Sequence, residues 1–108
     1  VRMIGDEKDF VTVWLTLGQR TLRYETYVMP APEENQAAVM EMLLRRNDQL
    51  IGAHFSIGQE DAVYLRGEIP DTAVSEAELD RVLGTVYVAV ENNFRALLRL
   101  AFASRFSA

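Results

Sequence analysis

His54 is the only histidine among the 108 residues, and histidine is the side chain that titrates near neutral pH without perturbation. Strand-like alternation puts Ser56 on the same face as His54, and a neighbouring strand could add Arg66 or Glu68 to complete a Ser/His/acid trio. A catalytic serine, however, needs a sharp turn that exposes its hydroxyl group, whereas Ser56 lies in a flat strand pattern. The sequence therefore predicts no catalytic residue, and we expect that the protein is not an enzyme.

Acidic residues gather in the middle of the chain, but their spacing matches no metal site. From Gln59 to Asp80, seven acidic residues stand against one basic residue, without the Asp-x-Asp-x-Asp-Gly run of a calcium loop. With one histidine and no cysteine, the chain has too few ligands for a zinc site. We expect no bound metal. A solvated charge pattern is the favoured interpretation, and an acidic patch that steers a basic partner is the alternative.

The composition also excludes several partners. Six glycines are scattered without a Gly-x-Gly motif, so the sequence predicts no nucleotide cofactor. The net charge of −5 argues against nucleic acid and anionic membranes as main partners. No apolar run approaches the roughly 20 residues of a membrane span, and no secretory leader is visible. We therefore expect no membrane contact and a cytoplasmic protein.

Alternating apolar and polar residues predict two β-hairpins. The first hairpin joins residues 10–17 to residues 21–29 through a short glycine-containing turn. The second joins residues 53–57 to residues 62–69, and residues 1–4 are interpreted as the tail of an earlier strand. In the strand over residues 10–17, the alternation predicts one dry face, which consists of Val11, Val13, Leu15 and Leu17.

A first helix is predicted after the first hairpin, over residues 32–46. Pro32 suits the first helical turn, where its missing N–H group would be unpaired in any case. Glu33 and Glu34 favour the positive end of the helix dipole, and Asn47 is interpreted as a left-handed cap.

A second, longer helix is predicted after the second hairpin. Ser75 and Glu78 form a capping box, which is the best local signal in the chain, and no proline interrupts the helical spacing before about Phe102. Apolar residues cover more of this helix than a single core face requires, which is typical of a helix with contacts on two sides.

The order of these elements predicts an α+β fold, in which helices cover one face of an antiparallel sheet. The other face would carry several aromatic and basic side chains, which are the types enriched where proteins bind each other. An ordinary amphipathic sheet face explains these side chains about equally well. Together with two side chains of the long helix, the predicted partner surface consists of Trp14, Tyr27, Tyr64, Arg66, Tyr87 and Leu98.

Five short sequence segments occur in an order and spacing that are similar to those of a known family. They are PEEN at 32–35, LLRRN at 43–47, AVYLRGEIP at 62–70, LDRVLG at 79–84 and AFASRF at 101–106. Because of these segments, the chain from about Val11 to its end resembles the YbjN-domain family in its actinobacterial form. The resemblance implies a fold similar to the dimeric chaperones of type III secretion, which have a curved antiparallel sheet with helices packed on one side.

Members of this family are labelled sensory-transduction regulators or chaperone-like proteins, and no reaction is established for them. The resemblance therefore implies no catalytic, cofactor-binding or metal-binding residue. Relatives usually have a helix before the first strand, whereas here the strand-like sequence begins almost directly at Val1. We expect a single YbjN-like domain over residues 1–108 without that helix.

The function that we expect is that of a non-enzymatic, chaperone-like protein-binding or regulatory module. It would act as a homodimer and hold a peptide or protein client by burying apolar helix or sheet surface against it. The alternative is a sensory or regulatory domain that binds a small ligand in a pocket between the sheet and the helices.

Overall fold

A computed structural model describes residues 1–106 of the chain. Its centre is a five-stranded antiparallel sheet with the strand order β1-β2-β3-β5-β4. The predicted hairpins are both present, and the pairing of β3 with β5 joins them. The strands are β1 (Arg2–Ile4), β2 (Phe10–Leu17), β3 (Thr21–Met29), β4 (His54–Ile57) and β5 (Val63–Pro70).

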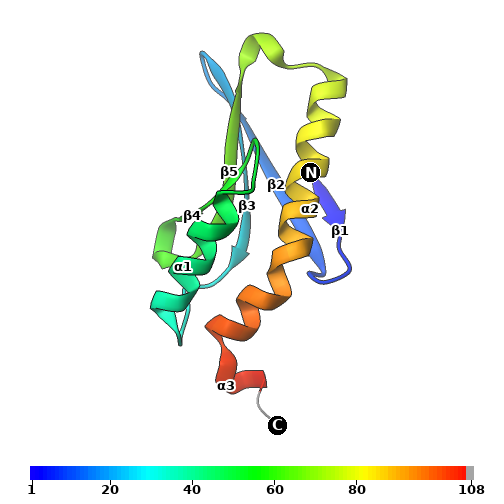
Figure 1. Cartoon of the computed structure of the whole chain (residues 1–108). Coiled ribbons are helices and arrows are strands. Elements are labelled where there is room, and N and C mark those ends of the chain that lie inside the picture. Colours follow the sequence, from blue (N-terminus) through cyan, green and yellow to red (C-terminus); the bar gives the residue numbers. More distant parts are fainter. Residues whose placement is uncertain (107–108) are drawn as a thin grey trace.

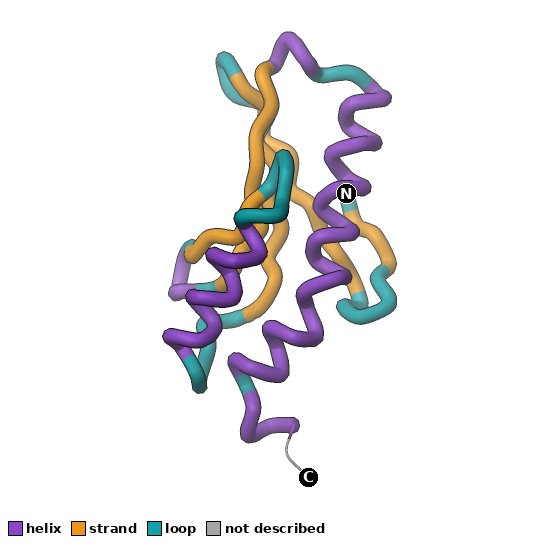
Figure 2. The backbone as a smooth tube through the Cα atoms, in the orientation of Figure 1, coloured by secondary structure: helices purple, strands orange, loops and turns teal. Residues whose placement is uncertain are grey.

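Two long helices cover one face of this sheet, as the sequence predicts. Helix α1 (Gln36–Asn47) contacts β4, and helix α2 (Glu76–Ala101) crosses β2 and β3, so both lie in front of the sheet in Figure 1. Figure 2 shows the same single helical layer, with the short helix α3 (Ala103–Phe106) after α2. Short 3-10 turns, Gln59–Asp61 and Asp71–Ala73, flank β5.

The core lies between the sheet and the helices, and strand alternation fills it. Inward-facing residues of β2, β3 and β5 meet inward-facing residues of both helices, and Thr26 is a polar side chain among them. The side chains with the lowest exposure include Val11, Val13, Val28, Val39, Val63, Leu65, Val86, Val90 and Leu97. The α+β class with helices on one face is thereby confirmed.

Helix α1 begins four residues later than the sequence predicts. Its N-cap is Asn35 in the left-handed conformation, and the preceding acidic residues are not in its first turn. The backbone N–H groups of Glu33 and Glu34 both donate to the Ala101 carbonyl, and the Glu33 carboxylate pairs with Arg105 at 2.7 Å. Residues 33–34 therefore stabilise the C-terminal end of α2, where carbonyl groups lack partners within the helix.

The end of α1 also differs from the prediction. Asn47 is not a left-handed cap, because it is the last residue of the helix and the cap position falls on Asp48 with a φ of −59°. The Asn47 side chain instead accepts a hydrogen bond from the Phe55 N–H group at 2.7 Å and donates to the Phe55 carbonyl at 3.0 Å. This pair of bonds fixes the end of α1 against β4.

The start of α2 follows its sequence signal. The Ser75 hydroxyl group accepts a hydrogen bond from the Glu78 N–H group at 3.1 Å, which is the capping contact that the sequence predicts. From there the helix runs for 26 residues and ends at Ala101. It is the longest element of the fold, and it presents side chains to the sheet, to α1 and to the loop between β1 and β2.

Candidate functional site

The sheet face opposite the helices, which we call the open face, collects polar and aromatic side chains from all five strands. Residues that are paired across the ladder point to the same side, so the register places these residues together. Four of the six residues predicted as a partner surface lie on this face, and they are Trp14, Tyr27, Tyr64 and Arg66.

Arg66 organises the centre of the open face. Its guanidinium group donates to the Glu25 carboxylate at 2.7 Å and to the Ser56 hydroxyl group at 3.3 Å. The same group lies 4.4 Å from the centre of the Tyr64 ring, whose edge-to-face contact with Tyr27 has a centroid distance of 5.7 Å. Burial raises the pKa of Tyr27, with smaller contributions from neighbouring groups. These contacts hold the two tyrosine rings in fixed positions.

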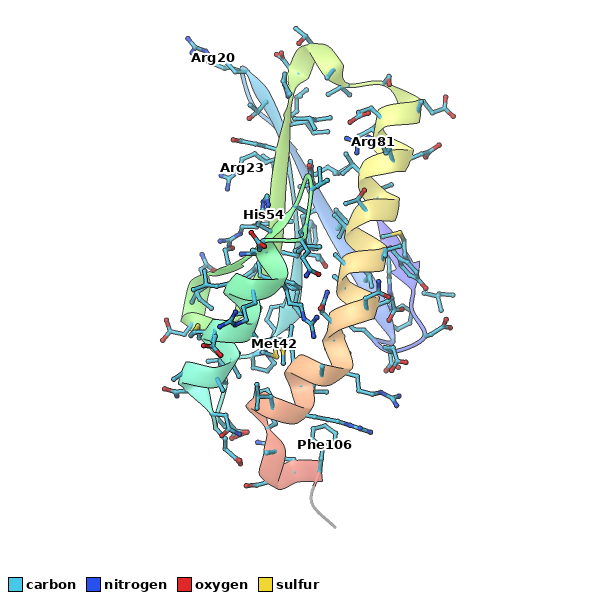
Figure 3. The ribbon with its side chains drawn as sticks, viewed as in Figure 1. Arg20, Arg23, Met42, His54, Arg81 and Phe106 are labelled. Atoms are coloured by element: carbon cyan, nitrogen blue, oxygen red, sulfur yellow. The ribbon has the colours of Figure 1, made fainter. Side chains whose placement is uncertain are left out.

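The serine and histidine that could have formed a catalytic trio are not joined to each other. Ser56 accepts its hydrogen bond from Arg66, and His54 is an exposed residue that lies opposite Arg66 in the ladder (Figure 3). Within residues 1–106, no group of three or more His, Asp or Glu side chains could hold a metal ion. The same described residues contain no helix that is long and apolar enough to cross a membrane.

A shallow hollow of about 450 Å³ lies on the open face, at the corner where β1, β2 and β3 meet. We call it the aromatic hollow. Three of its lining residues carry aromatic rings and two carry positive charges, and the Arg2 guanidinium carbon lies 3.6 Å from the centre of the Phe10 ring. The lining residues are Arg2, Lys8, Asp9, Phe10, Thr12, Trp14 and Tyr27.

Glu91 of α2 fixes the loop that carries Lys8 into this hollow. Its carboxylate accepts hydrogen bonds from three successive backbone N–H groups, those of Asp6, Glu7 at 2.9 Å and Lys8 at 3.2 Å. Burial by itself would raise the pKa of Glu91, but these N–H groups hold it below its ordinary value. Gly5 is required at the start of the loop, because a Cβ atom there would lie 2.2 Å from the Glu91 carboxylate.

Residues 14–17, at the end of β2, pair with β3 and extend beyond the pairing with β1. Strand β1 pairs only with residues 10–12, and Val1 adds two backbone bonds to Val13. Beyond that point, residues 14–17 have β3 on one side and no strand on the other among the described residues. Leu15 and Leu17 are 38% and 69% exposed, so the predicted dry face of this strand is wrong in its second half. We call residues 14–17 the β2 edge.

A separate groove of about 610 Å³ runs between the end of α1 and the middle of α2. Ile51 and Val88 both line it, and their exposed fractions are 84% and 53%. The last two residues of the predicted partner surface lie elsewhere on α2. Tyr87 donates a hydrogen bond to the Ile4 carbonyl, and Leu98 lines an apolar pocket with Phe102 and Phe106.

The aromatic hollow and the β2 edge are features that sequence reasoning did not find. Trp14 and Tyr27 were identified as binding candidates, but Arg2 and Lys8 were not, since only the pairing of β1 with β2 brings them alongside. Glu91 carried no signal either, because it lies 83 residues from Lys8 in the chain.

The fold defined here is that of the small chaperones of type III secretion. The chain is similar to a chain in the "heterodimeric complex ExoU-SpcU from the type III secretion system (T3SS) of Pseudomonas aeruginosa", with a TM-score of 0.63 and 13% identity over 94% of this chain and 81% of that one. It is also similar to a chain of the "HopA1-SchA Chaperone-Effector Complex", with a TM-score of 0.58 and 16% identity over 88% and 73%.

The chain belongs to the YbjN family, whose model is described as "Putative bacterial sensory transduction regulator" and matches residues 1–99. It is 38% identical to the "Uncharacterized protein Rv0487" of Mycobacterium tuberculosis and 34% identical to the "Uncharacterized protein ML2442" of Mycobacterium leprae, each over 96% of this chain. The chain spans 57% and 56% of the length of these two relatives. The family resemblance and its chaperone-like fold are thereby confirmed.

Proposed function

We propose that this domain is a non-enzymatic, chaperone-like protein-binding module, which acts as a cytoplasmic homodimer and holds an extended segment of a partner protein. The observation that carries the proposal is the exposed apolar surface of the β2 edge, where Leu15 is 38% exposed and Leu17 is 69% exposed. The chaperone-like fold supports a polypeptide partner, since both fold neighbours come from complexes of two proteins.

The β2 edge has the backbone chemistry of a strand acceptor. In an antiparallel strand, alternate residues direct their N–H and C=O groups to opposite neighbours. Val13 directs its groups outward, to Val1, so Leu15 and Leu17 direct theirs outward as well. An added strand would pair with these groups and cover both leucine side chains.

The side chains at this edge do nothing to repel such a strand. Natural edge strands are commonly protected by charged residues, proline or a bulge. Residues 14–17 read Trp-Leu-Thr-Leu, without a charge or a proline, and their pairing with β3 has no register shift. An edge of this kind favours association with another extended chain.

The homodimer is assigned to the groove between α1 and α2. Ile51 and Val88 expose apolar surface there, and polar side chains such as Gln49 and Asn92 surround it. An apolar centre with a polar rim is the usual composition of a protein interface. None of the residues that line the groove belongs to β2, so a second copy seated in the groove would contact residues other than those of the β2 edge.

The strand-acceptor proposal is tested with a displayed library of random peptides. We expect selection to enrich peptides with alternating apolar residues, and hydrogen exchange to show that a bound peptide protects the Leu15 and Leu17 amides. A variant with both Leu15→Lys and Leu17→Lys should lose this binding. Leu44→Lys, at an equally exposed leucine of α1, should retain it. Protection of other amides only, or no selected peptide, would contradict the proposal.

The homodimer is tested by light scattering. We expect a mass of about twice 12.2 kDa, and a monomer when Ile51→Asp is combined with Val88→Asp. Both side chains are exposed, so circular dichroism should not change. Leu44→Asp serves as the control and should remain dimeric. A monomeric parent protein at high micromolar concentration would rule the dimer out.

A further inference from the structure

We propose that the aromatic hollow binds a small ligand that carries an anionic group on a planar aromatic ring, as a nucleoside monophosphate or an aromatic carboxylate does. The hollow lies on the open face, and the leucines of the β2 edge point to the helical side of the sheet. The two sites share Trp14, but the hollow uses side chains of the open face whereas an added strand would use the backbone groups of Leu15 and Leu17, so each of the two can fail without the other.

The walls of the hollow fit a planar ring. Trp14 is 65% exposed and Tyr27 is also exposed. Tryptophan and tyrosine are among the side chains enriched at the hot spots of binding surfaces. The Tyr27 ring is fixed by its edge contact with Tyr64, so it offers a preformed wall. A ring that stacks on Trp14 would cover apolar surface that no described residue covers.

The charges of the hollow fit an anion. Neither Arg2 nor Lys8 forms an ion pair with another described residue, whereas five other arginines do. The Arg2 guanidinium carbon lies 3.6 Å from the centre of the Phe10 ring, and a guanidinium group offers several N–H donors that suit a phosphate or carboxylate group. Asp9 is the one acidic lining residue, so the lining carries a net positive charge in a protein of net charge −5.

The position of Lys8 is set before any ligand arrives. Its backbone is held by the Glu91 carboxylate, and the neighbouring Glu7 forms a 2.7 Å ion pair with Arg95 of α2. The Lys8 ammonium group lies 6.0 Å from the centre of the Tyr27 ring. A loop whose backbone is already held in place loses less conformational freedom when its lysine binds an anion, which strengthens the binding. Glu91 is thus a positioning residue for this site.

The size and charge of the molecule favour a small ligand over a nucleic acid. A hollow of about 450 Å³ is within the range of small-molecule sites. A polyanion would also meet the acidic residues of the rest of the surface, which outnumber the basic ones by 16 to 11.

Trp14 allows a direct test, because it is the only tryptophan in the chain and lies in the proposed site. Its fluorescence is titrated with adenosine monophosphate, benzoate, adenosine, inorganic phosphate and a ten-nucleotide oligoadenylate, with absorbance corrections. We expect saturable quenching by at least one of the first two, and at least tenfold weaker binding of adenosine and phosphate. The ligand that gives saturable quenching shows whether the bound anion is a phosphate or a carboxylate. No saturable quenching by either, or tighter binding of the oligonucleotide than of the monomer, would overturn the proposal.

Charge variants locate the site. Arg2→Gln and Lys8→Gln should each weaken binding of the saturating ligand at least fivefold, while the thermal midpoint stays that of the parent. Arg99→Gln makes the same change of net charge on the far part of α2 and should leave the affinity unchanged. An equal loss of affinity in all three variants would show general charge attraction and would refute a site at the hollow.

Discussion

Replacement of Glu91 by glutamine tests whether a carboxylate holds the loop between β1 and β2. The three backbone N–H groups of Asp6, Glu7 and Lys8 all donate to this one side chain, and a glutamine keeps its shape but not its charge. Its amide group also offers a donor where a second acceptor is needed. We expect Glu91→Gln to destabilise the fold and to release the loop.

The magnitude follows from the loss of charge assistance. A hydrogen bond to a charged group is about twice as strong as a neutral one, and a neutral bond contributes about 1 kcal/mol net when it is buried. The hydrogen bonds to Glu91 lie near solvent, and the one from Lys8 is long at 3.2 Å. We therefore expect the loss of the charge to weaken the three bonds together by only about 1 kcal/mol. For a domain of this size, that corresponds to a fall of about 4–8 °C in the thermal midpoint.

The pH dependence follows from the lowered pKa of Glu91. Burial opposes ionisation, but the backbone N–H groups favour it more, so the folded-state pKa lies below the unfolded value of about 4.3. The stabilisation by Glu91 is therefore fully present above that value and is lost as the pH falls through the folded-state pKa. The difference in unfolding free energy between the parent and Glu91→Gln should be largest at neutral pH and should shrink below about pH 4.

The assay is urea unfolding followed by circular dichroism at neutral and acidic pH, together with hydrogen exchange of the loop amides. Glu41→Gln is the control, because Glu41 forms only an exposed i,i+4 pair with Arg45 at 3.6 Å and should contribute at most about 0.5 kcal/mol. If Glu91→Gln is no more destabilising than Glu41→Gln, or if the difference grows as the pH falls, the reasoning is refuted.

Three further substitutions test contacts of the fold by the same urea assay. Asn47→Ala should lower the free energy of unfolding by about 1–3 kcal/mol, because the Phe55 N–H and carbonyl groups lose their side-chain partner. An unchanged free energy of unfolding would mean that water replaces the Asn47 side chain. Gly67→Ala should lower the free energy of unfolding by about 1–3 kcal/mol, since a Cβ atom would lie 2.3 Å from the Gly52 carbonyl oxygen and 2.4 Å from the Tyr24 ring; a neutral result would show that both the Gly52 backbone and the ring can move. Ser75→Ala should cost about 1 kcal/mol, whereas Ser75→Asp should cost little; equal losses would contradict the capping role.

The sequence pattern predicted the bounds of an element well where neighbouring residues alone determine those bounds. The bounds of β2 and β3 are those of their alternating residues, and the Ser75 cap places the start of α2. The start of α1 was wrong because its local signals have a second use. Pro32, Glu33 and Glu34 suit a first helical turn, but the backbone N–H groups of Glu33 and Glu34 instead donate to the Ala101 carbonyl at the end of α2. Only the tertiary fold decides between these two uses.

The candidate site was predictable only in part, because its two cations reach the hollow through contacts between residues that are distant in the chain. The aromatic residues of the open face follow from alternation within single strands, so Trp14 and Tyr27 could be identified. The cations beside them could not be identified, since Arg2 reaches the hollow through the pairing of β1 with β2, and Lys8 through the bonds of its loop to Glu91.

Alternation also reports which face of a strand is apolar without reporting whether anything covers that face. Val13 and Leu15 occupy the same face of β2, but Val13 is fully buried and Leu15 is exposed. The first turns of α2 stand apart from the far end of the β2–β3 hairpin, whose tip carries Arg20 (Figures 1 and 3). The helix therefore covers the first half of β2 and leaves the second half to solvent. The same pattern that folds the strand thus supplies, where the helix diverges, the apolar edge on which the proposed binding of a partner segment depends.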